Sequence, residues 1–161
     1  MRVAVIGSRT PSVSSVTRVM AYLDNHKDEI DEIVTGGAFG MDSEGMKWAM
    51  DNKIKLTVFA PAGWHNSTLC NRARKISGND IQDTGLGFNE RNTLIINNCD
   101  FVISGDYGNG TIDSFNKAIK KNLTVLVFGK YIPGNFYKST PKGVILLWNL
   151  LLTITGLGIR M

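Results

Sequence analysis

The chain has 161 residues, of which 43% are hydrophobic and 20% are charged. This length supports one hydrophobic core but not two, so we expect a single domain over residues 1–161. The formal net charge of +4 suits an anionic small molecule as well as nucleic acid, and it excludes neither class of partner.

The cysteines, the first residues and the apolar stretch near the end of the sequence predict the cellular location of the protein. Cys70 and Cys99 lack the spacing of metal ligands, which predicts reduced thiols and no metal site. The chain runs from Met1 straight into a strand-like segment, which leaves no room for a signal peptide. The apolar stretch 144–159 is interrupted by polar residues and is shorter than the roughly 20 residues of a membrane span. We therefore expect a cytoplasmic protein that does not cross a membrane.

Five short apolar segments are predicted as strands, at residues 2–6, 33–35, 56–59, 101–104 and 123–128. Helical patterns separate them, and these patterns contain Val16–Leu23, Met46–Met50, residues 89–98 and a segment that ends near Lys121. Alternation of apolar strands with helices predicts an α/β fold, a Rossmann-like open parallel sheet with helices on both faces.

Two segments depart from this alternation. Residues 60–87 form a long polar stretch, which we expect to be functional or to carry a short helix of its own. The sheet is expected to end near Phe128, followed by a loop over 129–143 and an apolar tail. We expect this tail to form a final strand or helix, with a role in a dimer interface.

Three loops follow predicted strands at the edge where open parallel sheets bind ligands. Glycine lets the backbone approach a phosphate closely, and the first amides of the next helix point at the anion. Any one of the loops could instead be a simple tight turn. Together they predict contacts with a phosphorylated ligand from Gly7, Ser8, Arg9 and Thr10, from Gly36, Gly37, Ala38, Gly40 and Asp42, and from Gly108, Asn109, Gly110 and Thr111.

Further side chains near these loops are candidates for the site. Arg9 offers a bidentate guanidinium to phosphate, and Arg91 and Asn92 lie where a helix should begin. Trp64 follows the third predicted strand, where an indole could stack on a base. Structural alternatives stay open, because Asp42 would also be stabilised by the helix dipole alone and Arg91 could form a surface ion pair.

The motifs as a set resemble a known superfamily, the SLOG group of Rossmann-like domains. The resemblance covers about residues 1–128, most closely the YspA- or YpsA-related branch and more distantly DprA and the LOG phosphoribohydrolases. It implies a site for a nucleotide or nucleotide derivative at the glycine loops, and frequent dimerisation. The matching motifs are Gly7-Ser8-Arg9, Thr35-Gly36-Gly37-Ala38-x-Gly40-x-Asp42, Trp64, Arg91-Asn92 and Gly108-x-Gly110-Thr111.

One departure from the superfamily bears on catalysis. The hydrolase branch has the pattern Pro-Gly-Gly-x-Gly-Thr-x-x-Glu, and Ser114 stands at the position of its glutamate. An enzyme of this type would need Asp113 or Asp106 as the catalytic carboxylate, together with Arg91. No cofactor is required by any motif.

These observations leave three functional hypotheses. The first is a sensor or carrier that binds a nucleotide or a phosphorylated nucleotide derivative, as a homo-oligomer. The second is a hydrolase or transferase that acts on the N-glycosidic bond of nucleoside monophosphates. The third is single-stranded DNA binding, which draws on the C-terminal third of the chain, where lysine and arginine occur without acidic residues after Asp113. Its candidate stacking residues are Tyr107, Tyr131, Phe136 and Tyr137.

Overall fold

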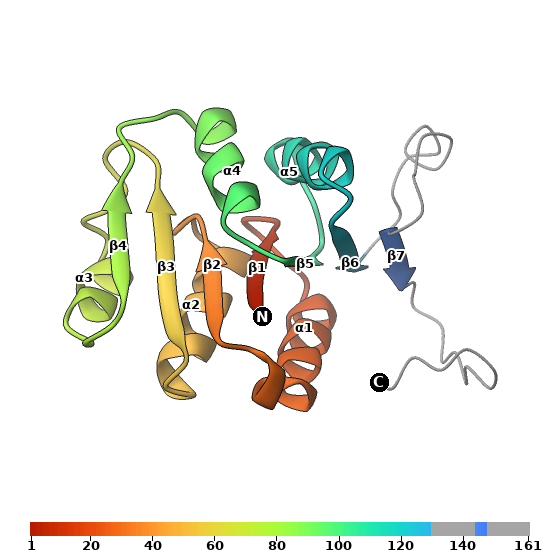
Figure 1. Ribbon diagram of the computed structural model, residues 1–161, viewed down its shortest axis with the longest axis horizontal. Coiled ribbons are helices and arrows are strands. Elements are labelled where there is room, and N and C mark those ends of the chain that lie inside the picture. Colours follow the sequence, from red (N-terminus) through yellow and green to blue (C-terminus); the bar gives the residue numbers. More distant parts are fainter. Residues whose placement is uncertain (130–143, 148–161) are drawn as a thin grey trace.

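Seven parallel strands form the sheet of the computed structural model, which describes residues 1–129 and 144–147. Their order is β4-β3-β2-β1-β5-β6-β7, which places β1 at the centre (Figure 1). The chain builds outward from β1 to β4 and then returns to add β5 on the other side of β1. The strands are β1 (Arg2–Gly7), β2 (Glu32–Thr35), β3 (Lys55–Ala60), β4 (Asp80–Asp83), β5 (Phe101–Gly105), β6 (Thr124–Phe128) and β7 (Val144–Leu147).

Helices cover both faces of the sheet (Figure 1). Side chains alternate along a strand, so Val3 and Val5 join the core beneath α1, α2 and α3, whereas Ala4 and Ile6 join the core beneath α4 and α5. This arrangement confirms the predicted α/β fold with a parallel sheet. The helices are α1 (Val13–Asn25), the 3-10 turn η1 (Lys27–Glu29), α2 (Met41–Asp51), α3 (Thr68–Arg74), α4 (Phe88–Asn97) and α5 (Asn109–Lys120).

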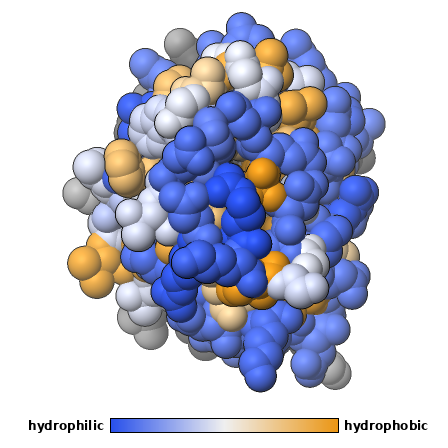
Figure 2. Space-filling view, turned by 90° about the vertical axis from the view of Figure 1, so that its left-hand side faces the viewer, coloured by the Kyte–Doolittle hydropathy of each residue, from blue (hydrophilic) through white to orange (hydrophobic). Residues whose placement is uncertain are grey.

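The polar stretch over residues 60–87 contains a strand that the sequence pattern did not reveal. It carries the expected short helix, α3, but also β4, which pairs with β3 at the edge of the sheet. Within β4 Asp80, Gln82 and Asp83 are exposed and Ile81 alone packs against the core, so the strand lacks an apolar run. Figure 2, which views the molecule from this side, shows a mostly hydrophilic surface. Polar side chains on an edge strand also hinder pairing with another chain.

The expectation that the sheet ends near Phe128 was wrong. Val144–Leu147 forms β7, which pairs in parallel with β6 from Val125 opposite Val144 to Phe128 opposite Leu147. A segment rich in glycine and proline separates the two strands in sequence, which is why it looked like the end of the sheet. The remainder of the predicted loop and tail, residues 130–143 and 148–161, lies outside the described residues.

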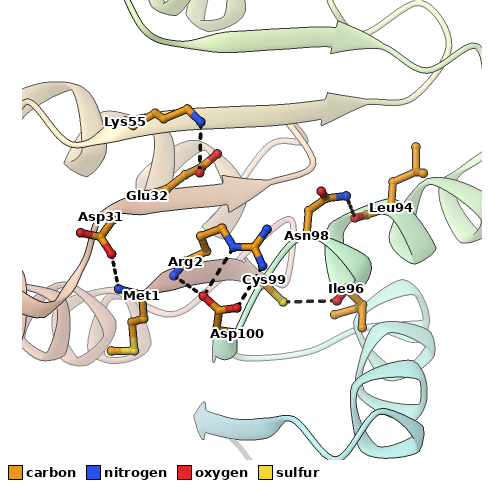
Figure 3. Close-up of polar contacts among 10 residues, drawn as sticks. All are labelled: Met1, Arg2, Asp31, Glu32, Lys55, Leu94, Ile96, Asn98, Cys99 and Asp100. Carbon is orange, nitrogen blue, oxygen red and sulfur yellow. Dashed lines mark hydrogen bonds and ion pairs between the residues drawn. The ribbon is translucent and has the colours of Figure 1, made fainter.

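Ion pairs gather at the edge of the sheet where the strands begin (Figure 3). The amino group of Met1 lies 2.5 Å from Asp31, and Lys55 on β3 lies 3.2 Å from Glu32 on β2. Asp100, just before β5, accepts hydrogen bonds from both the backbone and the guanidinium of Arg2. These contacts align the starts of neighbouring strands, and the loops at the opposite edge remain for the functional site.

Gly45 allows α2 to lie close to β1. A Cβ atom at this position would lie 2.7 Å from Cγ1 and 2.8 Å from Cβ of Val5. Gly45→Ala should therefore lower the free energy of unfolding by about 1–3 kcal/mol, although alanine favours the helix by about 1 kcal/mol. Gly110→Ala in α5 is the control, because its Cβ would meet no atom of the described residues within 4 Å. Urea denaturation showing equal stability for Gly45→Ala and the wild type would contradict the close packing.

The contact between Arg2 and Asp100 should make the free energy of unfolding depend on pH in the acidic range. The hydrogen bonds from Arg2 hold the pKa of Asp100 below its ordinary value of 3.8. A carboxyl whose pKa is lower in the folded state stabilises the fold above its unfolded pKa, and this stabilisation is lost as the pH falls through the folded pKa. Asp100→Asn should therefore be less stable than the wild type at pH 7, and the difference should vanish near pH 2. Thermal unfolding across this range measures both proteins.

Candidate functional site

A pocket of about 420 Å³ opens at the carboxyl edge of the sheet, where β1 and β5 lie side by side. The chain turns towards opposite edges of the sheet after these two strands, and their diverging loops leave a crevice that open α/β sheets commonly use for ligands. The lining residues come from the end of β1, from the loops that follow β1, β2 and β5, and from the starts of α2, α4 and α5. They are Ile6, Gly7, Ser8, Arg9, Ala38, Asp42, Phe88, Asn89, Arg91, Asn92, Gly108, Asn109, Gly110, Thr111 and Ser114.

Arg91 and Asp42 form a buried ion pair in the wall of this pocket. The two side chains approach to 3.6 Å between Nη1 and Oδ2, with Arg91 only 4% and Asp42 only 5% exposed. Burial raises the pKa of Asp42, and the charge of Arg91 and the Ala38 amide oppose this shift. Burial likewise lowers the pKa of Arg91, although a guanidinium keeps its proton in proteins. The positive charge of Arg91 is therefore permanent, and Asp42 is its partner.

Gly36 provides the space that this ion pair occupies. A Cβ atom at Gly36 would overlap the guanidinium of Arg91 and would lie 2.8 Å from Oδ2 of Asp42. The sequence predicted Gly36 as a ligand contact, but it does not line the pocket. Its role in the structure is to admit the side chain of Arg91 beneath the glycine loop.

The guanidinium of Arg91 has an unused donor. Its Nε is buried and, among the described residues, has no hydrogen-bond partner. Buried donors in proteins are nearly always satisfied, so an orphaned one needs an explanation. A ligand that accepts hydrogen bonds and carries negative charge would provide it.

Arg9 packs against two aromatic rings at the side of the pocket. Its guanidinium carbon is 4.7 Å from the centre of the Phe88 ring and 5.4 Å from that of Trp64. Cation–π contacts of this kind hold an arginine in place while its N–H groups remain free to donate at the edge. Trp64 was predicted to touch the ligand, but it does not line the pocket and contacts Arg9 instead.

The start of α5 contributes backbone amides to the pocket. Gly108 is the N-cap, and its own N–H donates to Oγ1 of Thr111 at 3.2 Å. The first amides of a helix have no acceptor within the helix, and the helix dipole adds positive potential there. Within the part of the chain that the structure describes, an added Cβ at Gly108 or Gly110 would meet no atom within 4 Å, so a ligand has room to approach this backbone.

Neither of the aspartates proposed for catalysis lines the pocket. Asp113 accepts hydrogen bonds from Asn92 at 3.1 Å and from Lys117 at 2.6 Å. Asp106 accepts the backbone N–H of Ser12 at 2.6 Å and so joins the end of β5 to the start of α1. Their catalytic roles stay predictions, and the carboxylate that does line the pocket is Asp42.

Thr10, Gly37 and Gly40 are predicted contacts that also lie outside the lining. The Thr10 amide donates to Oγ of Ser8 at 3.1 Å, and Gly37 and Gly40 both adopt positive φ, 68° and 80°. These residues therefore shape the loops. Sequence reasoning missed the lining residues Ile6, Phe88, Asn89 and Ser114 as ligand contacts, and for Phe88 and Asn89 the available signal was their position in the first turn before Arg91.

Residues 1–129 and 144–147 hold neither a candidate metal site nor a helix that could span a membrane. No group of three or more histidine, cysteine, aspartate or glutamate side chains there could hold a metal ion. No helix within the same residues is long and apolar enough to cross a membrane.

The ion pair should respond unequally to loss of either partner. Asp42→Asn leaves a buried guanidinium that cannot lose its proton, so it should destabilise the protein by about 3–5 kcal/mol. Arg91→Met leaves a carboxyl that can become neutral, so it should cost less. In that variant the pKa of Asp42 is raised by burial, and stability should fall as the pH rises from 5 to 7. Urea denaturation at both pH values tests this, and a pH-independent cost of Arg91→Met would contradict it.

Comparison with known proteins gives the family and several structures of the same fold. The family model of DNA recombination-mediator protein A matches residues 1–149, which is beyond the expected limit of resemblance near residue 128 and includes β7. The DNA processing protein A of Streptococcus pneumoniae has a TM-score of 0.70 and 22% identity, covering 91% of this chain and 58% of that one. The chain thus spans somewhat more than half of that relative.

Two further solved structures share the fold. DNA processing protein A of Helicobacter pylori, described with its single-stranded DNA binding mode, has a TM-score of 0.66 and 20% identity, covering 86% of this chain and 72% of that one. The molybdenum cofactor carrier protein of Chlamydomonas reinhardtii has a TM-score of 0.69 and 16% identity, covering 90% of this chain and 88% of that one. No curated protein sequence matches the chain.

These findings agree with the predicted resemblance at the level of the superfamily, and the YspA-related branch stays a prediction. The identities of 16–22% to solved structures show the fold alone. The family model is the stronger statement, because it matches most of the chain. The chain belongs to the DNA recombination-mediator protein A family.

Proposed function

We propose that this domain binds a phosphorylated nucleotide, with the phosphate held between Arg9, Arg91 and the start of α5. The observation that carries the proposal is the buried guanidinium of Arg91, which lines the pocket and has an unsatisfied Nε donor. Arginine matches the geometry of phosphate, and a second guanidinium, that of Arg9, lines the same pocket.

The size and polarity of the pocket support a ligand larger than phosphate. Its volume of about 420 Å³ lies in the range of small-molecule sites, which is roughly 300–1,000 Å³. Asp42 in its wall would repel a further negative charge but would accept a hydrogen bond from a hydroxyl group. A sugar phosphate satisfies both requirements, with the hydroxyl near Asp42 and the phosphate near the arginines.

The geometry supports binding more than catalysis. The two aspartates considered as catalytic groups are engaged by Asn92, Lys117 and the Ser12 amide. Ser114, at the position of the glutamate in the hydrolase branch, donates its hydroxyl to the carbonyl of Gly110 at 3.4 Å. Cleavage of an N-glycosidic bond is the alternative, and its signature would be free base released from a nucleoside monophosphate.

Single-stranded DNA is a second candidate ligand, favoured by membership of the DNA recombination-mediator protein A family. A nucleotide unit within a strand would present its phosphate to the same arginines. Tyr107, one of the aromatic residues expected to stack on bases, packs beside the core under α4 and α5. The other three lie outside the described residues.

Calorimetry with AMP, ribose 5-phosphate and a short oligodeoxythymidylate tests the proposal. Arg9→Ala should weaken binding of every ligand that the wild type binds by about tenfold to a hundredfold, because a hydrogen bond to a charged group is lost. Arg72→Ala is the matched control, since Arg72 is an exposed arginine of α3 that pairs with Asp51 away from the pocket.

Three outcomes separate the hypotheses. Binding of AMP without new products supports a sensor or carrier, whereas mass spectrometry that detects adenine supports the hydrolase. Binding of the oligonucleotide alone, weakening as salt rises, supports single-stranded DNA. Wild-type protein that binds none of these ligands would refute the proposed function.

A further inference from the structure

A row of three aromatic rings lies beside the pocket. Phe39 comes from the glycine loop after β2, Trp64 from the segment after β3 and Phe88 from the start of α4. The centres of the Phe39 and Trp64 rings are 5.1 Å apart, and those of Trp64 and Phe88 are 5.5 Å apart. Three separate elements therefore bring their rings together at one place.

Two of these rings are already engaged with a charged group. Trp64 and Phe88 both contact the guanidinium of Arg9. Among the described residues no cation contacts the Phe39 ring, and Phe39 is 65% exposed, which is unusual for a large aromatic residue. Trp64 supports Phe39 from one side, so much of the Phe39 ring is open to solvent.

The loop that carries Phe39 is well ordered by its own contacts. Gly37 and Gly40 on either side adopt positive φ, and the amide of Ala38 donates to Asp42 at 3.2 Å. The hydroxyl of Ser43 donates to the carbonyl of Ala38 at 2.8 Å. The exposed ring is therefore presented by a held backbone, so its exposure does not come from a loose loop.

We propose that Phe39 is a stacking subsite for the nucleobase of the ligand whose phosphate is held by Arg9 and Arg91. This inference rests on the proposed function. Ala38, the residue before Phe39, lines the pocket, and the Phe39 ring contacts Trp64, which packs on the lining residue Phe88. A base is planar, as the ring is, and stacking on an aromatic side chain tolerates any base. The subsite would therefore recognise that a base is present without selecting which one.

The surroundings of Phe39 favour a base over an apolar partner surface. Arg9 lies next to the aromatic row, and the pocket that adjoins it is lined by two arginines and an aspartate. An apolar protein surface would cover the charge of Arg9 without supplying an anion to balance it, which is costly. A base linked to a phosphate would place its ring on Phe39 and its charge at the arginines.

Comparison of ligands with and without a base tests the subsite. AMP and ribose 5-phosphate are titrated into the wild type, Phe39→Ala and Phe39→Trp. Phe39→Ala should weaken AMP binding by about fivefold to a hundredfold and leave ribose 5-phosphate within about twofold, because only AMP can stack. Phe39→Trp should restore AMP binding. Equal urea midpoints confirm that the variants fold, as expected for an exposed side chain.

Short oligodeoxythymidylate distinguishes a base on a free nucleotide from a base on a strand. If Phe39→Ala weakens binding of the oligonucleotide and the wild type does not bind AMP, the base belongs to a strand and the stacking subsite is supported. If Phe39→Ala leaves AMP and oligonucleotide binding unchanged while Arg9→Ala weakens both, the stacking subsite is refuted and the phosphate site survives. Equal weakening of AMP and ribose 5-phosphate would also refute it. Failure of the wild type to bind any ligand overturns both proposals together.

Discussion

The buried contact between Arg91 and Asp42 is the constraint on which the rest of the site depends. It places a permanent positive charge in the interior, and a charge there is tolerated only with a partner. Gly36 admits the guanidinium, and Asp42 both balances it and accepts the amide of Ala38. The shape of the second glycine loop, the position of α4 and the charge of the pocket are consequently linked through three residues.

The topology of the sheet explains why these residues meet. In a parallel sheet all strands end at the same edge, and the chain leaves β1 and β5 in opposite directions. The first and third glycine loops therefore face each other across a crevice, with the start of α4 above it. The opposite edge is closed by ion pairs such as that between Arg2 and Asp100 (Figure 3). Contacts at the amino ends of the strands align the sheet, and the loops at the carboxyl ends form the site.

The same fold supports proteins described with single-stranded DNA and with the molybdenum cofactor, so the fold does not decide the ligand. The decision rests with the side chains at the crevice. Here two guanidiniums line the pocket, one paired with a buried carboxylate and the other held by aromatic rings. This combination suits a phosphate that is joined to a sugar and a base, whether free or within a strand.

The sequence by itself determined the α/β alternation, the three glycine loops and most of the residues that line the pocket. These features depend on local patterns, because apolar runs form buried strands and glycines at strand ends permit close approach. The edge strand β4 escaped detection because only Ile81 packs on the core. The stretch that contains β7 was expected to form a final strand or helix, but not to extend the sheet, because a glycine- and proline-rich segment precedes it. β4 lacks the apolar run that marks a buried strand, and a local pattern does not show that β7 pairs with β6.

Only the tertiary structure decided which of the candidate residues line the pocket and which contact other elements. Asp106 accepts the amide of Ser12, Asp113 accepts hydrogen bonds from Asn92 and Lys117, and Trp64 contacts Arg9. None of the three lines the pocket. The pairing of Arg91 with Asp42 joins residues that are far apart in the sequence. Such partnerships depend on which strand ends become neighbours, and a local pattern carries no information about that distance.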